Sequence, residues 1–486
     1  MVRRALAGFA ALALLAGTSL PADARDASRE ARARRTSPFN LGVSSTYSMS
    51  FNEWVCGLTD IGEVCSSAVG SSVGGGGFWP SGTANQYIFN SGLQVAGIVG
   101  ADGGQWAGDT IARFFFNASA DGSGAPWGDG IYASNRQEDL EAWPDDCFID
   151  NPVFGRVKTL SELDTCVQYW DGDPTAPGFD GAHPLGILVT QHSLLWSFPS
   201  NKDIMFFIYR FENVTNRAEF QTRNPGTPAT GYTITNLYSA FAMDPDVSGG
   251  DYDDNYATVV PELDLGIAWN TDFESGDFVP YAPNFDAAIG FVGVKFLQSP
   301  ANTSDTTITV RVGAETRQVA PGEELGLTFF SVFTNGGVMS DAQNSLQAFR
   351  YLSGKLNQTE QTQWCTGAPP GMCYVNLAAP DDMRFYQSSG PFELGPGESA
   401  EIVVAYVAGA PVPGTYTKGE VIPVGDVADT TRAIEKVMGR GYDVPGFPSL
   451  FANAQTAQAI YDAQFVLPAP PRSPNVTVIP GDRQNT

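Results

Sequence analysis

Strand-like runs recur through the middle of this chain and constrain its fold more than any other feature. Three of them are GILVTQHSLLWSF at 186–198, DIMFFIYRFENVT at 203–215 and TITNLYSAFAMD at 233–244. They are rich in β-branched and aromatic residues with partial alternation, and turn residues separate them, which is typical of antiparallel strands. A comparable run covers residues 399–410. We therefore predict a mainly β protein, with an antiparallel β-sandwich-like region over residues 38–410.

Helical periodicity is concentrated in the last third of the chain. Residues 341–356 begin with Asp341 as an expected N-cap and place four apolar side chains on one face. These four are Leu346, Phe349, Leu352 and Leu356. Two further amphipathic segments, 427–438 and 449–465, fall within a predicted helical segment of residues 411–467. The architecture should therefore include a few helices in its C-terminal third.

The N-terminus predicts export. Arg3 and Arg4 precede an apolar run from Ala5 to Gly17, and Ala22-Asp23-Ala24 has the form of a cleavage site. Residues 1–24 thus read as a secretory signal peptide, too short to span a membrane. No other stretch reaches 18 apolar residues, so we expect no transmembrane segment in the mature chain and a secreted or cell-surface location. Residues 25–37 form a basic linker, expected to be disordered.

The net charge limits the partners of this chain. Twenty-seven Lys and Arg stand against 53 Asp and Glu, which gives a formal charge of −26. An acidic surface of this size repels nucleic acids and anionic membranes, and it favours solubility and divalent cations. We therefore expect no nucleic-acid partner.

Six cysteines occur as three close pairs. An even number of cysteines in an exported chain favours disulfides, and pairing within each neighbourhood is the simplest of the fifteen connectivities. A zinc site is the alternative, but no C-x-x-C occurs and only His183 and His192 could assist. The predicted disulfides are Cys56–Cys65, Cys147–Cys166 and Cys365–Cys373.

An acidic loop follows the run that ends at residue 244. Five Asp lie within eleven residues without a Lys or Arg among them, and so much like charge repels itself unless it is solvated or holds a cation. Residues 244–249, DPDVSG, match the first six positions of a calcium loop. An EF-hand is excluded, because Asn255 replaces the Glu at position 12 and strands flank the loop. The sequence leaves two readings, a solvated loop or a non-helical Ca²⁺ site formed by Asp244, Asp246, Asp251, Asp253 and Asp254.

Residues 111–182 form a loop-rich, aromatic insertion. Trp127, Trp143 and Trp170 each lie close to an Asp in the sequence. Such Trp side chains can stack on a sugar face while the acids bond its hydroxyls, or they can plug loops onto the edge of a sandwich. Long ordered loops often carry function, so this insertion is the predicted place for glycan binding.

The sequence singles out no catalytic residue and no organic cofactor. A Ser-His-Asp triad would have to use His183 or His192, and neither lies in a recognisable nucleophile motif. A glycosidase needs two carboxylates about 5–9.5 Å apart, and 53 acidic residues do not identify such a pair.

Four stretches resemble a group of uncharacterised exported bacterial β-rich proteins that often carry C-terminal fibronectin type III or sorting domains. They are GGFWPSGTANQYIFNSGLQVAG, DPDVSGGDYDDNY with LDLGIAWNTD and IGFVGVKFLQSP, FYQSSGPFELGPGESAEIVVAYVAG, and PPRSPNVTVIPGDRQNT. The resemblance implies an extracellular protein with a modular C-terminus, in which residues 468–486 are a Pro-rich spacer and the truncated start of a fibronectin type III-like domain. It implies no catalytic residues.

These features together favour a non-enzymatic, exported or cell-surface protein stabilised by calcium, which acts in adhesion or extracellular binding of a glycan or a surface protein. The alternative is a carbohydrate-active protein, either a lectin-like binder or a glycoside hydrolase, that uses the Trp- and Asp-rich loops at 111–182.

Overall fold

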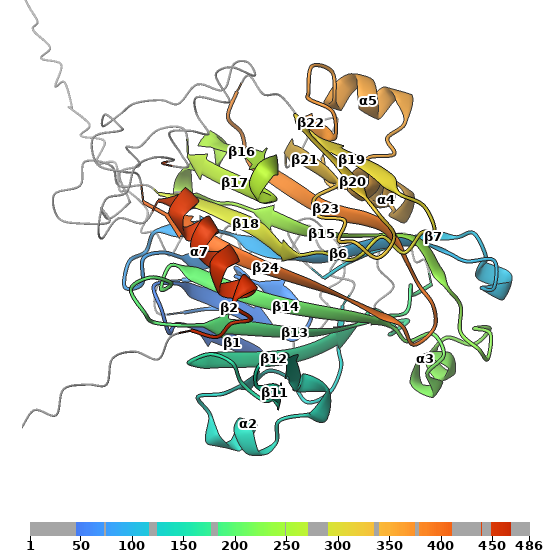
Figure 1. Ribbon diagram of the computed structural model, residues 1–486, viewed down its shortest axis with the longest axis horizontal. Helices are drawn as coiled ribbons and strands as arrows, with labels where there is room; N and C mark the ends of the chain where they lie inside the picture. The colour runs from blue at the N-terminus through green and yellow to red at the C-terminus, as the bar shows by residue number, and fades with distance from the viewer. Residues whose placement is uncertain are drawn as a thin grey trace, which may run out of the picture.

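The strand-like runs predicted at 186–198, 203–215, 233–244 and 399–410 lie in two stacked sheets (Figure 1). The computed structural model describes residues 45–71, 74–115, 124–175, 183–247, 249–270, 290–334, 340–374, 379–410, 439 and 449–467. The predicted signal peptide, basic linker, helix at 427–438 and C-terminal spacer lie outside these residues. The mainly β, antiparallel sandwich expected from the sequence is confirmed. Among the described helices, none is long and apolar enough to cross a membrane.

In the described part of the chain, one sheet has eleven strands, and its longest members are β6, β15 and β23. Its strands are β1 (Thr46–Met49), β2 (Val55–Thr59), β3 (Glu63–Val64), β4 (Gly77–Phe78), β5 (Gln86–Ile88), β6 (Asn90–Val99), β7 (Thr110–Phe114), β15 (Ile234–Asp244), β21 (Phe329–Thr334), β22 (Met372–Tyr374) and β23 (Met383–Leu394). Neighbours pair antiparallel, except that β21 and β22 run parallel.

The other sheet has nine described strands, with β14 and β24 paired at its centre. Its strands are β8 (Ala125–Pro126), β9 (Tyr132–Ala133), β12 (Leu163–Trp170), β13 (Ile187–Leu195), β14 (Ile204–Asn213), β16 (Asn255–Val260), β17 (Leu265–Asn270), β18 (Phe291–Gln298) and β24 (Ser399–Gly409). Two hairpins stand apart from the sheets, β10 (Ile149–Asn151) with β11 (Gly155–Val157) and β19 (Ile308–Val312) with β20 (Glu315–Val319).

The core lies between the two sheets and is strongly aromatic. Tyr209 of β14 meets Phe241 of β15 with ring centroids 4.9 Å apart, and Tyr406 of β24 shares a 2.7 Å hydrogen bond with Ser91 of β6. Aromatic pairs of this kind contribute about 0.5–1.5 kcal/mol beyond their buried area. The hydroxyl of the buried Tyr406 is therefore hydrogen-bonded across the core.

Helix α7 (Leu450–Asp462) covers the outer face of the nine-stranded sheet over β18 and β24 (Figure 1). The Ser449 side chain caps it by accepting a 3.1 Å hydrogen bond from the backbone N–H of Ala452. Just beyond the helix, Phe465 packs on Phe206 of β14, with centroids 5.6 Å apart. The outer face of β14 is therefore buried at this end, which is why that strand is apolar on both faces. The helix expected at 449–465 is confirmed.

Helix α4 (Ser345–Ser353) packs on the outside of the eleven-stranded sheet and corrects two details expected from the sequence. Its N-cap is Asn344, whose side chain accepts from the N–H of Gln347 at 2.8 Å, because Asp341 instead pairs with Arg384. Leu346 is 52% exposed, so the buried stripe is narrower than the periodicity implied.

The other helices among the described residues are short. They are α2 (Gln137–Glu141), α3 (Ala218–Arg223) and α5 (Gln358–Trp364), with 3₁₀ turns η1 (Gly104–Trp106), η2 (Asp145–Cys147), η4 (Gly249–Asp254) and η5 (Pro261–Leu263).

All three predicted disulfides are confirmed. Cys56–Cys65 and Cys365–Cys373 close loops with sequence separations of nine and eight residues, and Cys147–Cys166 closes one of nineteen. The last of these bonds ties η2 to β12. Residues 111–182 were expected to be a loop-rich insertion, but they contribute β8, β9 and β12 to the nine-stranded sheet, and the bond holds η2 against that sheet.

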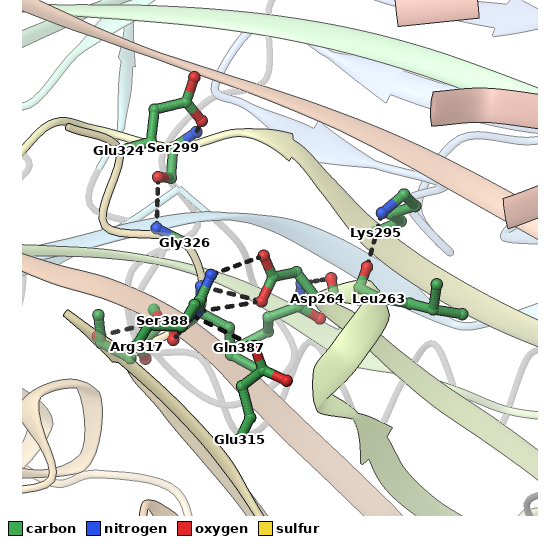
Figure 2. A network of polar contacts seen from close by, with 12 residues as sticks. Leu263, Asp264, Lys295, Ser299, Glu315, Arg317, Glu324, Gly326, Gln387 and Ser388 are labelled. Carbon is green, nitrogen blue, oxygen red and sulfur yellow. Dashed lines mark hydrogen bonds and ion pairs between the residues drawn. The ribbon is translucent and has the colours of Figure 1, made fainter. Parts of the chain in front are cut away.

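A polar network joins the two sheets near the β16–β17 turn (Figure 2). Asp264 adopts a left-handed conformation there, with φ of 47°, and its carboxylate accepts two 3.3 Å hydrogen bonds from the guanidinium of Arg317 on β20. Its backbone carbonyl accepts from the side chain of Gln387 on β23 at 2.8 Å. Lys295 of β18 donates to the carbonyl of Leu263 at 2.7 Å. Burial lowers the pKa of Lys295, and Asp264 partly opposes that shift.

Candidate functional site

Trp127 lies at the edge of the nine-stranded sheet, directly after the short strand β8. That strand pairs with the end of β12, and the backbone N–H of Trp127 donates to the carbonyl of Gln168 at 3.0 Å. Trp170, at the end of β12, meets Trp127 edge to face with ring centroids 4.7 Å apart. Trp170 is 2% exposed, whereas Trp127 is partly buried, so the two rings form a fixed floor and a partly accessible wall.

Helix α3 supplies the opposite wall of this site. Phe220 anchors it by packing edge to face on Trp170, with centroids 6.4 Å apart. Arg223 lies over the ring of Trp170 at 5.5 Å and pairs with Asp173 at 2.9 Å. Burial alone would raise the pKa of Asp173, but hydrogen bonds from Thr175 and the charge of Arg223 lower it. Asp173 is therefore ionised at neutral pH and compensates the guanidinium.

Between these walls lies an open cleft of about 590 Å³, which we call the larger hollow. Glu219 and Thr222 of α3 are exposed and line it together with the two tryptophans. The sequence predicted the two tryptophans of this site but not Glu219 and Arg223. Their i, i+4 spacing, which places both on one side of a helical turn, was the available signal.

A second, smaller hollow of about 320 Å³ also borders Trp127. Trp127 and Gly128 line both hollows, and Asp129, Ala142 and Pro144 also line the smaller one.

Trp143 has a structural position beside the smaller hollow. It is 5% exposed, packs with Cys147 and Cys166, and donates from Nε1 to the carbonyl of Cys147 at 2.9 Å. It lines neither hollow, so the structure does not bring it together with Trp127 and Trp170.

The acidic loop does not gather all five of its predicted ligands. Asp244, at the end of β15, and Asp246 are buried, at 2% and 1% exposure, while Asp253 and Asp254 are exposed on η4. The side chain of Asp251 lies outside the described residues.

A third carboxylate joins the two buried ones. Asp382 lies just before β23, and one oxygen from each of Asp244, Asp246 and Asp382 falls within 4.8 Å of the others. Oxygen donors of this kind suit Ca²⁺. Arg384 also reaches this cluster, 3.2 Å from Asp244 and 2.8 Å from Asp341. Burial alone would lower the pKa of Arg384, but Asp244, Asp341 and Asp382 raise it, so the guanidinium stays charged.

The two histidines lie outside both hollows. His183 stacks on Trp106 with centroids 4.3 Å apart, and its Nε2 is 3.3 Å from Asp109. His192 is 5% exposed within β13. Burial lowers the pKa of both rings.

No family model and no curated protein matches this chain. Among solved structures, the chain is similar to a candidate aldose 1-epimerase from Escherichia coli K12, at 10% identity and a TM-score of 0.25, over 75% of this chain and 99% of that one. The comparisons give no support to the non-enzymatic, adhesive function expected from the sequence, and we withdraw that expectation. A TM-score of 0.25 carries no argument about the substrate or reaction of this protein.

Proposed function

We propose that this protein binds carbohydrate in the cleft between Trp127 and helix α3. One observation carries the proposal: Trp127 is partly accessible at the wall of a cleft of about 590 Å³, and Trp170 holds its ring in place. An indole offers a flat apolar face on which a sugar ring can stack. Glu219, Thr222 and Arg223 place charged and hydroxyl groups around that face, where they can bond sugar hydroxyls.

Binding is a better supported activity than hydrolysis. A glycosidase needs two carboxylates flanking the scissile bond. Among the described residues that line the larger hollow, Glu219 is the one carboxylate, and Asp129 lines the smaller hollow.

A glycan array with the purified secreted chain tests the proposal. Trp127→Ala should reduce binding of any array ligand at least tenfold, because it removes the stacking face. Phe154→Ala is the matched control, since Phe154 is 54% exposed and lines neither hollow. Binding that Trp127→Ala leaves unchanged, or an array without any bound glycan, would contradict the proposal.

Export is part of the same proposal. The three disulfides are compatible with an extracellular location, as is the lack of a membrane-spanning helix among the described ones. The resemblance to exported bacterial β-rich proteins stays a prediction. N-terminal sequencing of the secreted product should find Arg25 first, and a retained Met1 would contradict this.

We also propose that Asp244, Asp246 and Asp382 hold one Ca²⁺ that stabilises the fold. The observation favouring it is that their oxygens lie within 4.8 Å of one another, two of the three residues being buried. An ion that binds only the folded state adds about 2.7 kcal/mol at a hundredfold excess over its dissociation constant.

The calcium proposal is tested by melting the chelator-treated protein with and without millimolar CaCl₂. Calcium should raise the melting temperature of the wild type, and Asp382→Asn should abolish most of that rise. Asp253→Asn, at an exposed position of the same acidic loop, should retain it. A wild-type melting temperature that calcium leaves unchanged would contradict a stabilising Ca²⁺ at these three acids.

A further inference from the structure

The two hollows beside Trp127 adjoin one another. Both are lined by Trp127 and Gly128, the larger extending toward α3 at Thr222 and the smaller toward Ala142 and Pro144, beyond α2. Gly128 is exposed and has no side chain, so Trp127 contributes the one side chain that lines both spaces among the described residues. Their volumes, about 590 and 320 Å³, each fall within the range of about 300–1,000 Å³ that ligand sites occupy.

We propose that the two hollows are subsites of one groove that binds an extended oligosaccharide of neutral or amino sugars, with Trp127 as the stacking platform between them. This inference rests on the carbohydrate binding proposed above. A monosaccharide fills one hollow, whereas a chain of several sugars crosses Trp127 and contacts both. Affinity should therefore rise with chain length until both hollows are filled.

The charges of the groove select the class of sugar. Glu219 lines the larger hollow and Asp129 the smaller, and both are exposed. Arg223 is the cation of the larger hollow, but Asp173 compensates its charge at 2.9 Å. The chain as a whole carries −26. Polyuronates and sulfated glycans are repelled by such a surface, while neutral sugars are tolerated and protonated amino sugars are attracted.

Isothermal titration with length ladders tests the inference. The probes are cello-oligosaccharides and chitosan oligosaccharides of one to six residues, with oligogalacturonates of the same lengths as the anionic series. We expect at least a tenfold rise in affinity from the monosaccharide to the tetra- or pentasaccharide, then a plateau. The chitosan series should weaken with added salt, because screening reduces its attraction to Glu219 and Asp129.

Two blocking variants separate the subsites. Thr222→Trp fills the larger hollow and Ala142→Trp the smaller, and both positions are exposed, so the fold should tolerate the change. Each should reduce the affinity for the longest oligosaccharide to that of a short one. Thr362→Trp, an exposed threonine on the short helix α5, is the matched control and should bind as the wild type does.

The outcomes distinguish this inference from the function on which it rests. Equal affinity for the monosaccharide and hexasaccharide, tighter binding of oligogalacturonates, or no binding of any ladder would overturn the extended groove. Carbohydrate binding itself falls only if the glycan array also shows no ligand that depends on Trp127.

Discussion

Trp170 holds Trp127 edge to face, with ring centroids 4.7 Å apart, at the point where β8 ends against β12. The buried ring is fixed in turn by Phe220 and by Arg223 from α3. The accessible ring is therefore positioned before any ligand arrives, which reduces the entropy lost on binding.

The first prediction concerns this support. Trp170→Leu should lower glycan affinity several-fold by freeing the Trp127 ring, and it should destabilise the fold by about 2–4 kcal/mol through lost packing. Trp170→Phe keeps an aromatic edge and should restore most of the affinity. Titration and urea unfolding of both variants measure the two effects separately. Equal affinities for the Leu and Phe variants would show that Trp170 does not position Trp127.

The second prediction concerns the disulfide beneath the smaller hollow. Replacing Cys147 and Cys166 by Ala should cost about 3 kcal/mol of stability, since the bond closes a loop with a separation of nineteen residues. Because Cys147 lines the smaller hollow, affinity for long oligosaccharides should also fall. Replacing Cys365 and Cys373 should cost about 2–3 kcal/mol and leave affinity unchanged. A matching loss of affinity in both double variants would indicate a global effect instead.

The sequence predicted what local patterns carry. Runs of β-branched and aromatic residues between turns predicted the strands β13, β14, β15 and β24, and close spacing predicted the disulfides. Helix α7 was predicted because its apolar residues recur at helical spacing within one contiguous stretch, 449–465. Each of these features depends on residues within about twenty positions of one another.

Long-range pairing was beyond local patterns. Asp382 meets Asp244 and Asp246 because β23 pairs antiparallel with β15, and that register brings together residues more than 130 positions apart. Glu219 faces Trp127 for a similar reason, since α3 follows β14 while Trp127 precedes β12. Without the strand order, neither neighbour could be chosen from the many acidic residues of the chain.

The third prediction concerns the network between the sheets. Arg317→Ala should destabilise the protein by about 1–2 kcal/mol, because it removes two hydrogen bonds to Asp264 and a third, of 2.7 Å, to the carbonyl of Leu327. Arg317→Lys should recover little, since an ammonium cannot reproduce the fork. As a control, Arg210→Ala removes a 3.9 Å ion pair to Glu212 and a 3.3 Å hydrogen bond to Ser399, both from an exposed guanidinium, and should change stability by less than about 0.5 kcal/mol. Urea unfolding that finds equal effects for Arg317→Ala and Arg210→Ala would refute the structural role of the network.

The fourth prediction concerns the pH dependence of stability. His192 is buried in β13, and burial lowers its pKa to about 4. In the unfolded chain its pKa is about 6.5, so below that pH the unfolded state takes up a proton that the folded state refuses. The stability that the protein has with a neutral His192 is fully present above pH 6.5, and it is lost as the pH falls toward 4. The loss is on the order of 3 kcal/mol.

Asp164, on the neighbouring strand β12, acts in the opposite direction. Burial raises its pKa to about 6, although hydrogen bonds from Ser161 and Leu160 partly oppose the shift. The contribution of the protonated Asp164 to the free energy of unfolding is fully present below the unfolded pKa of about 3.9. It is lost as the pH rises through 6. Variants must therefore separate the two groups. Urea unfolding measures the free energy of unfolding at pH 7 and at pH 4.5. Between these pH values, we expect this free energy to fall less for His192→Gln than for the wild type, and to fall more for Asp164→Asn. If both variants follow the wild-type pH profile, neither buried group titrates as its burial requires.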